Sequence, residues 1–333
     1  MGRWTPDGRY FVFVSWPDIW IVRDRAGLLG AGVEPVKLDI GPLHAQCLLP
    51  STDGKRLFFE AVQSQNEFLR YDSRTGRFSL ELAGISGTGL AFSRDGKSIA
   101  YVSIPEGNLF RAAADGSGRR QLTWPATRRP SMPRWSPDDQ QIAFTAIPSG
   151  NADRVYVMPS GGGPLRQVSN GEAGSYGDWD PSWSPDGAAL AFGATVWDKP
   201  AQKFIHVVDL KTGHVSALPG SEGMWSPRWS PDGRFIAGEN AILYDLQTHK
   251  QTTLFNQGCG YPLWSRTGEF LFCHADSGFW RIRVSDRKAE LVVAPKDFAP
   301  VDWGWYVLDP HDSLIVARPT GAGDIYALEW ELP

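Results

Sequence analysis

The sequence predicts an all-β fold of about eight four-stranded blades arranged as a β-propeller, with seven blades as the alternative. A tight-turn motif, complete at residues 229–233 as Trp-Ser-Pro-Asp-Gly, recurs along the whole chain at intervals of 42 to 48 residues, with one interval of 35. The flanking segments are short apolar runs, and none shows the i, i+3, i+4 spacing of an amphipathic helix. A period of about 44 residues with this strand chemistry is typical of one propeller blade.

The turn motif defines the first two strands of each blade, a and b. Proline presets φ, aspartate bonds its own backbone and glycine accepts a positive φ, so the motif closes a hairpin. The last two copies depart from the motif and predict their turns less directly. The eight turns fall at Asp7-Gly8, Asp53-Gly54, Asp95-Gly96, Asp138-Asp139, Asp186-Gly187, Asp232-Gly233, Thr267-Gly268 and His311-Asp312.

A third strand, c, follows each turn by about a dozen residues, and a polar turn then leads to strand d. When the eight strands c are aligned, one position carries a bulky side chain. His206 occupies this position in one blade, which favours a structural role over catalysis. Across the eight blades this position reads Trp20, Leu69, Phe110, Tyr156, His206, Ile242, Trp280 and Tyr326.

Both chain ends interrupt the repeat. The first blade begins almost at its turn, and the last ends after strand c, so we expect these two blades to be incomplete. We expect a single domain over residues 1–333. We see no charged-then-apolar leader and no apolar run long enough for a membrane span.

Composition narrows the chemistry. A net charge of −4 and a pI near 5.9 argue against a nucleic-acid surface, which needs a basic stripe. Three cysteines do not suggest a disulfide framework, and we interpret Cys47 and Cys273 as buried free thiols. No metal-ligand spacing or nucleotide motif is present, so we expect no cofactor and no metal.

The Trp-Ser-Pro-Asp-Gly repeat resembles the WD40-like (PD40) propeller repeat of TolB-type proteins over essentially the whole chain. Residues 3–13, 218–223 and 324–330 are more similar to bacterial (CadC-like) transcriptional regulators, in which a winged-helix domain precedes a TolB-like propeller. No winged-helix sequence is present here, so DNA binding does not carry over. The resemblance implies a bacterial sensor or interaction domain, with an extracytoplasmic, periplasmic location.

The aromatic residues that the repeat does not explain point to a binding site. Strand direction alternates, so the b–c and d–a connections emerge on one face of the ring, and most surplus aromatics lie in them. Because variable loops on a constant scaffold usually carry binding, we predict a ligand site at this channel mouth. Its residues are Arg129, Tyr176, Asp178, Trp179, Asp180, Trp225, Tyr261, Trp303 and Trp305. The alternative is that these rings pack between blades.

Two functions from different classes remain open. The first is a non-catalytic module that binds a protein or peptide segment or a small ligand. The second is a propeller enzyme, such as a lyase, glycosidase or peptidase-associated gate. Asp178 and Asp180, two residues apart on a strand, would lie about 7 Å apart, which suits paired carboxylate chemistry. We favour binding because the sequence offers no further acid, base or metal group beside this pair.

Two structural expectations follow from the register of the repeat. Arg134 and Arg228, each one residue before a motif tryptophan, should flank Asp180 from neighbouring blades and keep it ionised. Trp135, Trp183 and Trp229 should be buried between blades.

Overall fold

A computed structural model gives the fold of the chain. The structure describes residues 2–15, 18–23, 34–41, 43–62, 65–124, 129–147, 152–171, 177–195, 203–294 and 306–329. The contacts within the chain divide it into two compact units, whereas the sequence predicted one domain over residues 1–333. Unit 1 comprises residues 1–66 and 319–333, and unit 2 comprises residues 67–318.

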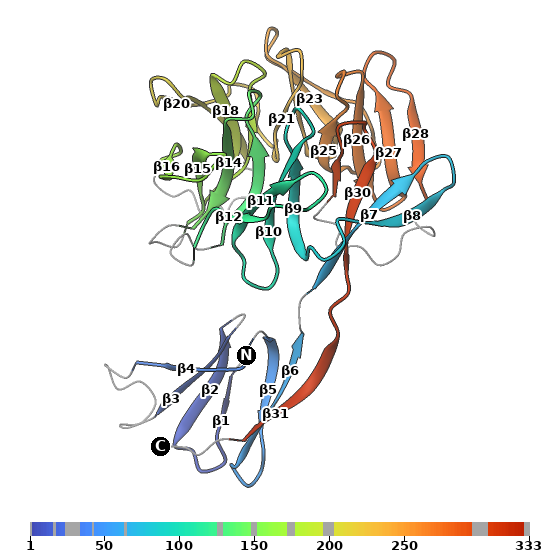
Figure 1. Ribbon diagram of the computed structural model, residues 1–333. Helices are drawn as coiled ribbons and strands as arrows, with labels where there is room; N and C mark the ends of the chain where they lie inside the picture. Colours follow the sequence, from blue (N-terminus) through green and yellow to red (C-terminus); the bar gives the residue numbers. More distant parts are fainter. Residues whose placement is uncertain are drawn as a thin grey trace. The chain divides into compact units, whose positions relative to one another are not determined.

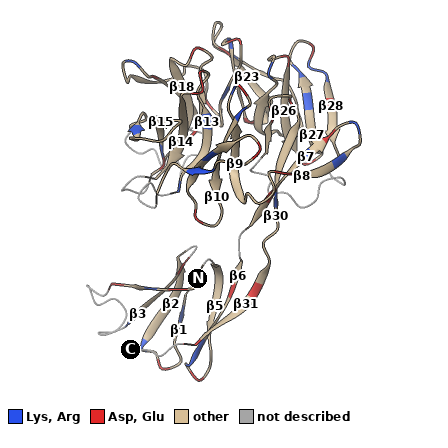
Figure 2. Ribbon diagram, viewed as in Figure 1, with Lys and Arg blue, Asp and Glu red and all other residues tan. Residues whose placement is uncertain are grey.

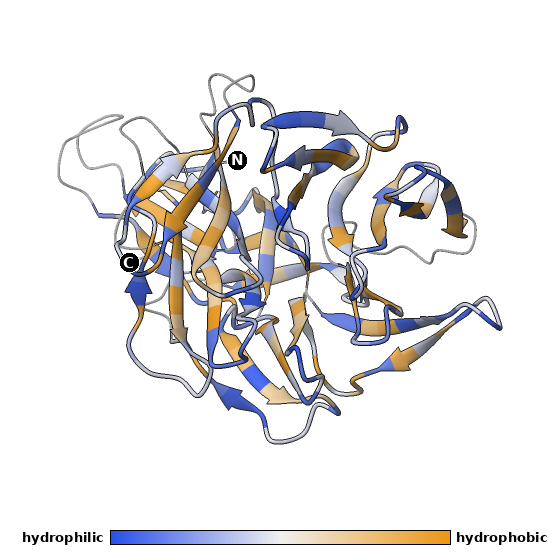
Figure 3. Cartoon of the chain, turned by 90° about the horizontal axis from the view of Figure 1, so that it is seen from above, coloured by the Kyte–Doolittle hydropathy of each residue, from blue (hydrophilic) through white to orange (hydrophobic). Residues whose placement is uncertain are grey.

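The described strands form eight antiparallel sheets, seven with four strands and one with three, which confirms the predicted all-β class and the number of repeats. Hydrophobic residues fall mainly on the strands and hydrophilic residues mainly on the connections (Figure 3). The only helical segment among the described residues is the 3-10 turn η2 (Glu239–Ala241). This agrees with the lack of amphipathic-helix spacing in the sequence.

Unit 2 contains five sheets whose four strands follow one another along the chain (Figure 1). The first sheet contains β9 (Gly87–Phe92), β10 (Ser98–Ser103), β11 (Leu109–Ala113) and β12 (Arg120–Gln121). The second contains β13 (Ser131–Trp135), β14 (Gln141–Ala146), β15 (Arg154–Pro159) and β16 (Arg166–Gln167). The third contains β17 (Gly177–Trp183), β18 (Ala189–Thr195), β19 (Phe204–Asp209) and β20 (Val215–Ala217).

The other two consecutive sheets continue the same order. The fourth contains β21 (Arg228–Trp229), β22 (Phe235–Gly238), β23 (Ile242–Asp245) and β24 (Lys250–Thr253). The fifth contains β25 (Gly260–Trp264), β26 (Phe270–Ala275), β27 (Gly278–Arg283) and β28 (Ala289–Val293).

The sixth sheet of unit 2 joins strands from opposite ends of the sequence, in the order β29-β30-β7-β8. We call it the closing sheet; in Figure 1 its blue strands β7 and β8 lie beside the red β30. An ion pair of 2.6 Å joins Arg318 Nη2 to Glu67 Oε2 within this sheet. The strands are β29 (Tyr306–Leu308), β30 (Leu314–Pro319), β7 (Asn66–Asp72) and β8 (Arg77–Glu81).

Six apolar clusters, one at each boundary between neighbouring sheets, close unit 2 into a ring. The closing sheet packs on both of its neighbours. Leu69 and Val316 pack against Phe272 and Phe279 of the fifth sheet, while Ile315 on the opposite face packs in a cluster with residues of the first sheet. The remaining four boundaries have equivalent clusters. Burial of apolar side chains on both faces of every sheet therefore stabilises the ring.

Unit 1 contains the other two sheets, which pack on each other through one apolar cluster that includes Val12, Ile19, Leu57 and Phe59. One sheet contains β1 (Gly2–Trp4), β2 (Tyr10–Ser15), β3 (Asp18–Arg23) and β4 (Val36–Leu38). The other is the three-stranded sheet of β5 (His44–Pro50), β6 (Arg56–Val62) and β31 (Gly323–Glu329).

The second and eighth repeats exchange their strands c, which explains why the repeats are split between two units. Strand c of the eighth repeat, β31, pairs with strand b of the second, β6, and Tyr326 stacks on Phe59 with ring centroids 5.8 Å apart. Strand c of the second repeat, β7, instead joins β30, where the aliphatic Leu69 shares a cluster with Val316. The exchange thus matches an aromatic pair and an aliphatic pair.

The turn motif forms the hydrogen bonds that its residue types predict. Ser230 Oγ donates to Asp232 Oδ1 over 2.5 Å, and the backbone N–H of Arg234 donates to the same oxygen over 3.1 Å. Gly233 has a φ of +78°, which glycine adopts without strain. The aspartate therefore shapes the turn.

The motif tryptophans connect adjacent sheets. As predicted, Trp135 and Trp183 are buried, and their indole N–H groups donate to the carbonyls of Ala91 and Arg134 in the preceding sheet. Trp229 differs, because it is partly exposed and its indole donates to Gly233 of its own turn.

The interpretation of Cys273 as a free thiol is wrong. Cys259 and Cys273 form a disulfide whose Cα atoms are 5.6 Å apart. Cys259 lies in the connection that enters the fifth sheet, beside strand b of that sheet, and both residues are buried. The pairing depends on this tertiary contact, which residue spacing alone does not reveal. Cys47 is the free cysteine.

Candidate functional site

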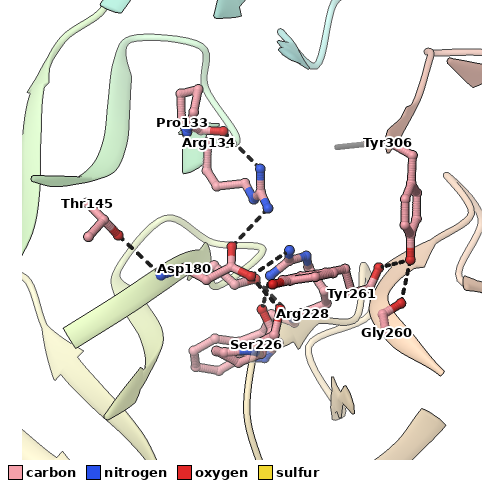
Figure 4. Close-up of polar contacts among 12 residues, drawn as sticks. Pro133, Arg134, Thr145, Asp180, Ser226, Arg228, Gly260, Tyr261 and Tyr306 are labelled. Carbon is pink, nitrogen blue, oxygen red and sulfur yellow. Dashed lines mark hydrogen bonds and ion pairs between the residues drawn. The ribbon is translucent and has the colours of Figure 1, made fainter. Parts of the chain in front are cut away.

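A buried carboxylate lies among the inner strands of unit 2 (Figure 4). Arg134 Nη2 is 2.9 Å from Asp180 Oδ1, and Arg228 Nη2 is 2.8 Å from Oδ2. The Ser226 hydroxyl donates a hydrogen bond to Oδ2. The backbone N–H of Asp180 donates to Thr145 Oγ1 over 3.2 Å. Both carboxylate oxygens are therefore hydrogen-bonded to charged or hydroxyl donors.

The two arginines hold Asp180 in its charged form. Burial by itself raises the pKa of this carboxyl, but Arg228 and Arg134 outweigh that effect and lower it below its usual value. Burial, together with the charge of Arg228, lowers the pKa of Arg134 to about 10, so this arginine remains charged at neutral pH. Because the arginines come from the sheets on either side of β17, the predicted flanking of Asp180 is confirmed.

A bulge in the inner strand positions Asp180. The pairing register of β17 with β18 shifts between Trp179 and Ser182, and Asp180 has a φ of +53°, which aspartate tolerates better than most residues. The same positive φ recurs three residues before the motif aromatic residue in each of the five consecutive sheets. These residues are Gly89, Met132, Asp180, Ser226 and Tyr261. This recurring position was not predicted from the sequence, although its fixed offset from the motif aromatic residue is a signal that the sequence contains.

Asp178 belongs to a different cluster. Its Oδ2 is 3.8 Å from Arg154 Nη1, and the side chain is almost fully buried. Burial raises the pKa of this carboxyl, and a hydrogen bond from Ser169 and the charge of Arg154 offset only part of that effect. Burial likewise raises the pKa of Asp153. Asp178 and Asp180 thus have separate partners, and no described basic group joins them into one acid–base unit.

The partly buried Trp179 and Trp225 lie against glycines. Trp179 is the cross-strand partner of Gly193. A Cβ atom on Gly193 would lie 2.6 Å from the Trp225 ring, so only glycine leaves room for this indole. On Gly177, a Cβ would lie 2.8 Å from Trp179 Nε1. Both rings therefore depend on a neighbouring backbone without a side chain.

Charged groups accompany Trp225. Lys203 Nζ is 5.7 Å from the centroid of the Trp225 ring and 3.6 Å from Glu239 Oε2. The backbone N–H of Glu239 donates to the Trp225 carbonyl over 3.0 Å. Burial raises the pKa of Glu239, and Lys203 opposes that shift. This end of unit 2 thus combines half-buried indoles with both signs of charge.

Tyr261 borders a small internal cavity of about 20 Å³ that Arg134, Arg228 and Tyr306 also line. The Tyr306 hydroxyl donates to the carbonyls of Gly260 and Tyr261, the latter over 2.6 Å. Burial raises the pKa of Tyr306. This cavity is too small for more than a water molecule.

The remaining predicted site residues divide into two groups. Arg129 is exposed and has a φ of +53°. Tyr176, Trp303 and Trp305 lie outside the described residues. Of the predicted mouth residues that the structure describes, Arg129 is exposed and Trp179, Trp225 and Tyr261 are partly exposed, whereas Asp178 and Asp180 are buried.

The described residues contain no group of three or more His, Cys, Asp or Glu side chains able to hold a metal ion. In the same part of the chain, no helix has the length and apolar character needed to cross a bilayer. Basic and acidic residues are interspersed over the described strands and turns (Figure 2).

Comparison with known proteins gives a family match. A family model described as the TolB beta propeller domain matches residues 88–259, just over half of the chain. No curated protein matches. A putative TolB from Agrobacterium tumefaciens is similar in structure, with 17% identity and a TM-score of 0.62 over 77% of this chain and 98% of that one.

Two further structures are similar. TolB from Acinetobacter baumannii has 17% identity and a TM-score of 0.52, covering 79% of this chain and 65% of that one. An oligogalacturonate lyase in complex with manganese has 15% identity and a TM-score of 0.49, covering 95% of this chain and 87% of that one. At these identities the likeness concerns the fold alone.

Proposed function

The chain belongs to the TolB β-propeller domain family, and on that premise we propose that it is a non-catalytic interaction propeller. It serves as a sensor or protein-interaction domain of a larger bacterial protein and holds a protein or peptide segment. The ligand lies on the face where the b–c and d–a connections emerge. The described residues that carry this site are Trp179, Lys203, Trp225 and Glu239.

The observation that carries the proposal is the environment of the two tryptophans. Trp179 and Trp225 are neither buried in a cluster nor fully exposed, and Lys203 and Glu239 lie beside Trp225. Partly buried aromatic residues with a charged rim are the usual centre of a protein-recognition surface. Gly193 and Gly177 fix where the rings lie, so the surface exists before a ligand arrives.

The carboxylates support binding over catalysis. Asp180 is held ionised by two arginines, and these contacts leave it no role as a proton donor near neutral pH. Asp178 lies against Arg154 in a separate cluster. A lyase or glycosidase mechanism needs groups that converge on one substrate, and this pair does not supply them.

The disulfide supports an oxidising location. Disulfides persist in the periplasm and outside the cell and are rare in the cytosol. The Cys259–Cys273 bond is therefore consistent with the extracytoplasmic placement that the sequence resemblance implies.

Peptide selection tests the proposal. Peptides selected by phage display against the full chain should bind with an affinity that Trp225→Ala and Trp179→Ala each weaken by at least tenfold, the scale of an interface hot spot. The matched control is Leu291→Ala, because Leu291 is an exposed apolar residue of β28. Equal loss in the control would contradict the site. Turnover of a polysaccharide or peptide substrate that Asp178→Asn abolishes would establish the enzyme alternative instead.

A further inference from the structure

A cavity of about 450 Å³ lies in unit 2, at the end of the ring opposite the proposed interaction surface. The residues that line it come from the a–b turns of all six sheets, so it lies around the ring axis where these turns emerge. Its wall is formed by the motif aromatic position of every sheet. These residues are Phe92, Trp135, Trp183, Trp229, Trp264 and Leu308.

The residue two positions after each of these wall residues forms the rim, and its identity differs between sheets. Four sheets place a proline there, and the first and fifth sheets place Arg94 and Arg266. Both arginines are exposed. They belong to the two sheets that adjoin the closing sheet, so both cations lie on one side of the cavity. The prolines are Pro137, Pro185, Pro231 and Pro310.

The acidic residues of the same lining are engaged. Arg70 forms an ion pair with Asp309, and Asp309 also accepts the backbone N–H groups of His311 and Ser313. Asp312 Oδ1 accepts the backbone N–H of Arg266 over 2.9 Å. The exposed Arg94 and Arg266 side chains contribute positive charge to an aromatic concavity, whereas Arg134, which also lines it, is paired with Asp180.

We propose that this cavity is a second binding site, for an anionic group carried on an aromatic or apolar body. Its volume lies in the range of ligand sites, and four indoles suit a flat apolar group. Guanidinium groups bind carboxylates through paired hydrogen bonds. Acidic peptide side chains and free aromatic acids share this chemistry. The site lies at the other end of the ring from the proposed interaction surface and does not depend on it.

Anilinonaphthalene sulfonate (ANS), an anionic aromatic dye, is the probe. The full chain should show a saturable fluorescent component that Arg94→Gln and Arg266→Gln each weaken about tenfold. Glutamine keeps the backbone N–H groups that Asp139 and Asp312 accept, so the fold is preserved. The control is Arg77→Gln with Arg166→Gln, two exposed arginines outside the cavity, and it should leave ANS binding unchanged.

Competition identifies the source of the anion. N-acetyl-phenylalanine or an acidic peptide should displace ANS, and the uncharged amide of N-acetyl-phenylalanine should not. The blocked acidic peptide Ac-Gly-Glu-Phe-Glu-Gly-amide distinguishes a protein segment from a free acid: displacement by the peptide alone assigns the site to a segment, and displacement by the free acid assigns it to aromatic acids generally. Equal displacement by acid and amide, or ANS binding that the Arg94 and Arg266 variants leave unchanged, overturns the proposal.

Discussion

The backbone N–H of Arg94 donates a 2.6 Å hydrogen bond to Asp139 of the next sheet. Arg266 and Asp312 repeat this relationship at the boundary between the fifth sheet and the closing sheet. At the other four boundaries of the ring, a proline, which has no N–H, lies beside a glycine of the next turn. These pairs are Pro137–Gly187, Pro185–Gly233, Pro231–Gly268 and Pro310–Gly96. At two boundaries an arginine–aspartate pair therefore takes the place of the proline–glycine pair, because the aspartate carboxylate needs a backbone N–H donor and proline has none.

This pairing predicts coupling between two substitutions. Asp139→Gly alone should remove the bonds to the Arg94 and Asp95 N–H groups, and Arg94→Pro alone should leave the Asp139 carboxylate without one of its donors. The double variant recreates the contact used at the other boundaries. We expect it to be more stable than the sum of the single changes by about 0.5–1.5 kcal/mol. Urea unfolding measures the cycle, and additive effects would contradict the pairing.

Asp180→Asn should be strongly destabilising. It leaves Arg134 and Arg228 buried without their counter-charge, which costs about 3–5 kcal/mol of unfolding free energy at neutral pH. Since the folded-state pKa of Asp180 lies below 3.8, its stabilisation is complete above that pH and is lost as the pH falls through the lowered pKa. The difference from the parent chain should therefore shrink in acid. Chemical denaturation at pH 7 and at a pH well below 3.8 measures it.

Asp178→Asn is the matched control and should behave oppositely. Burial raises the folded-state pKa of Asp178 above 3.8, so the folded state binds more protons than the unfolded state and the charge costs stability as the pH rises. We expect the amide to leave the unfolding free energy at pH 7 unchanged or higher. If Asp178→Asn is as destabilising as Asp180→Asn, Arg154 contributes more to the fold than its 3.8 Å contact indicates.

The disulfide predicts a response to reductant. It closes a loop with a sequence separation of 14, which corresponds to about 3 kcal/mol of stabilisation. Cys273→Ala should lower the unfolding free energy by a similar amount, and Cys47→Ala should have little effect because Cys47 is partly exposed. Thiol titration of the unreduced, unfolded chain should find one thiol. Three thiols would show that the bond does not form.

Unit 2 should fold without unit 1. All six apolar boundaries of the ring lie within residues 66–319. A chain of residues 66–319 should therefore give a β-sheet circular dichroism spectrum and a cooperative thermal transition. An unfolded product would mean that the closing sheet needs β6 and β31 to form.

The repeat made most of the fold predictable, because each blade encodes its own turns and strands. The spacing of the repeat copies along the sequence was enough to predict the all-β class and the number of sheets. Their alignment also predicted the Arg134–Asp180–Arg228 contact. The exchange of β7 and β31 was not predicted, because either strand c satisfies the same repeat pattern, and the stacking of Tyr326 on Phe59 is seen only in the fold.

The candidate site was less predictable than the fold. Trp179 and Trp225 were identified because the repeat left them unexplained, but the sequence does not show that their rings lie against Gly177 and Gly193, because these contacts form only in the folded sheets. The cavity at the a–b turns was missed for the opposite reason. Its walls are the motif residues themselves, and a structural explanation for each of them concealed the concavity that they enclose.

Hydrogen exchange of the full chain, measured with and without a selected peptide, tests the proposed interaction surface around Trp179 and Trp225. We expect slowed amide exchange on peptide binding at residues 177–180, 203–204, 223–226 and 239–241, the described backbone around Trp179 and Trp225. Protection confined to the a–b turns of unit 2, or to unit 1, would contradict an interaction surface on the face of the b–c and d–a connections.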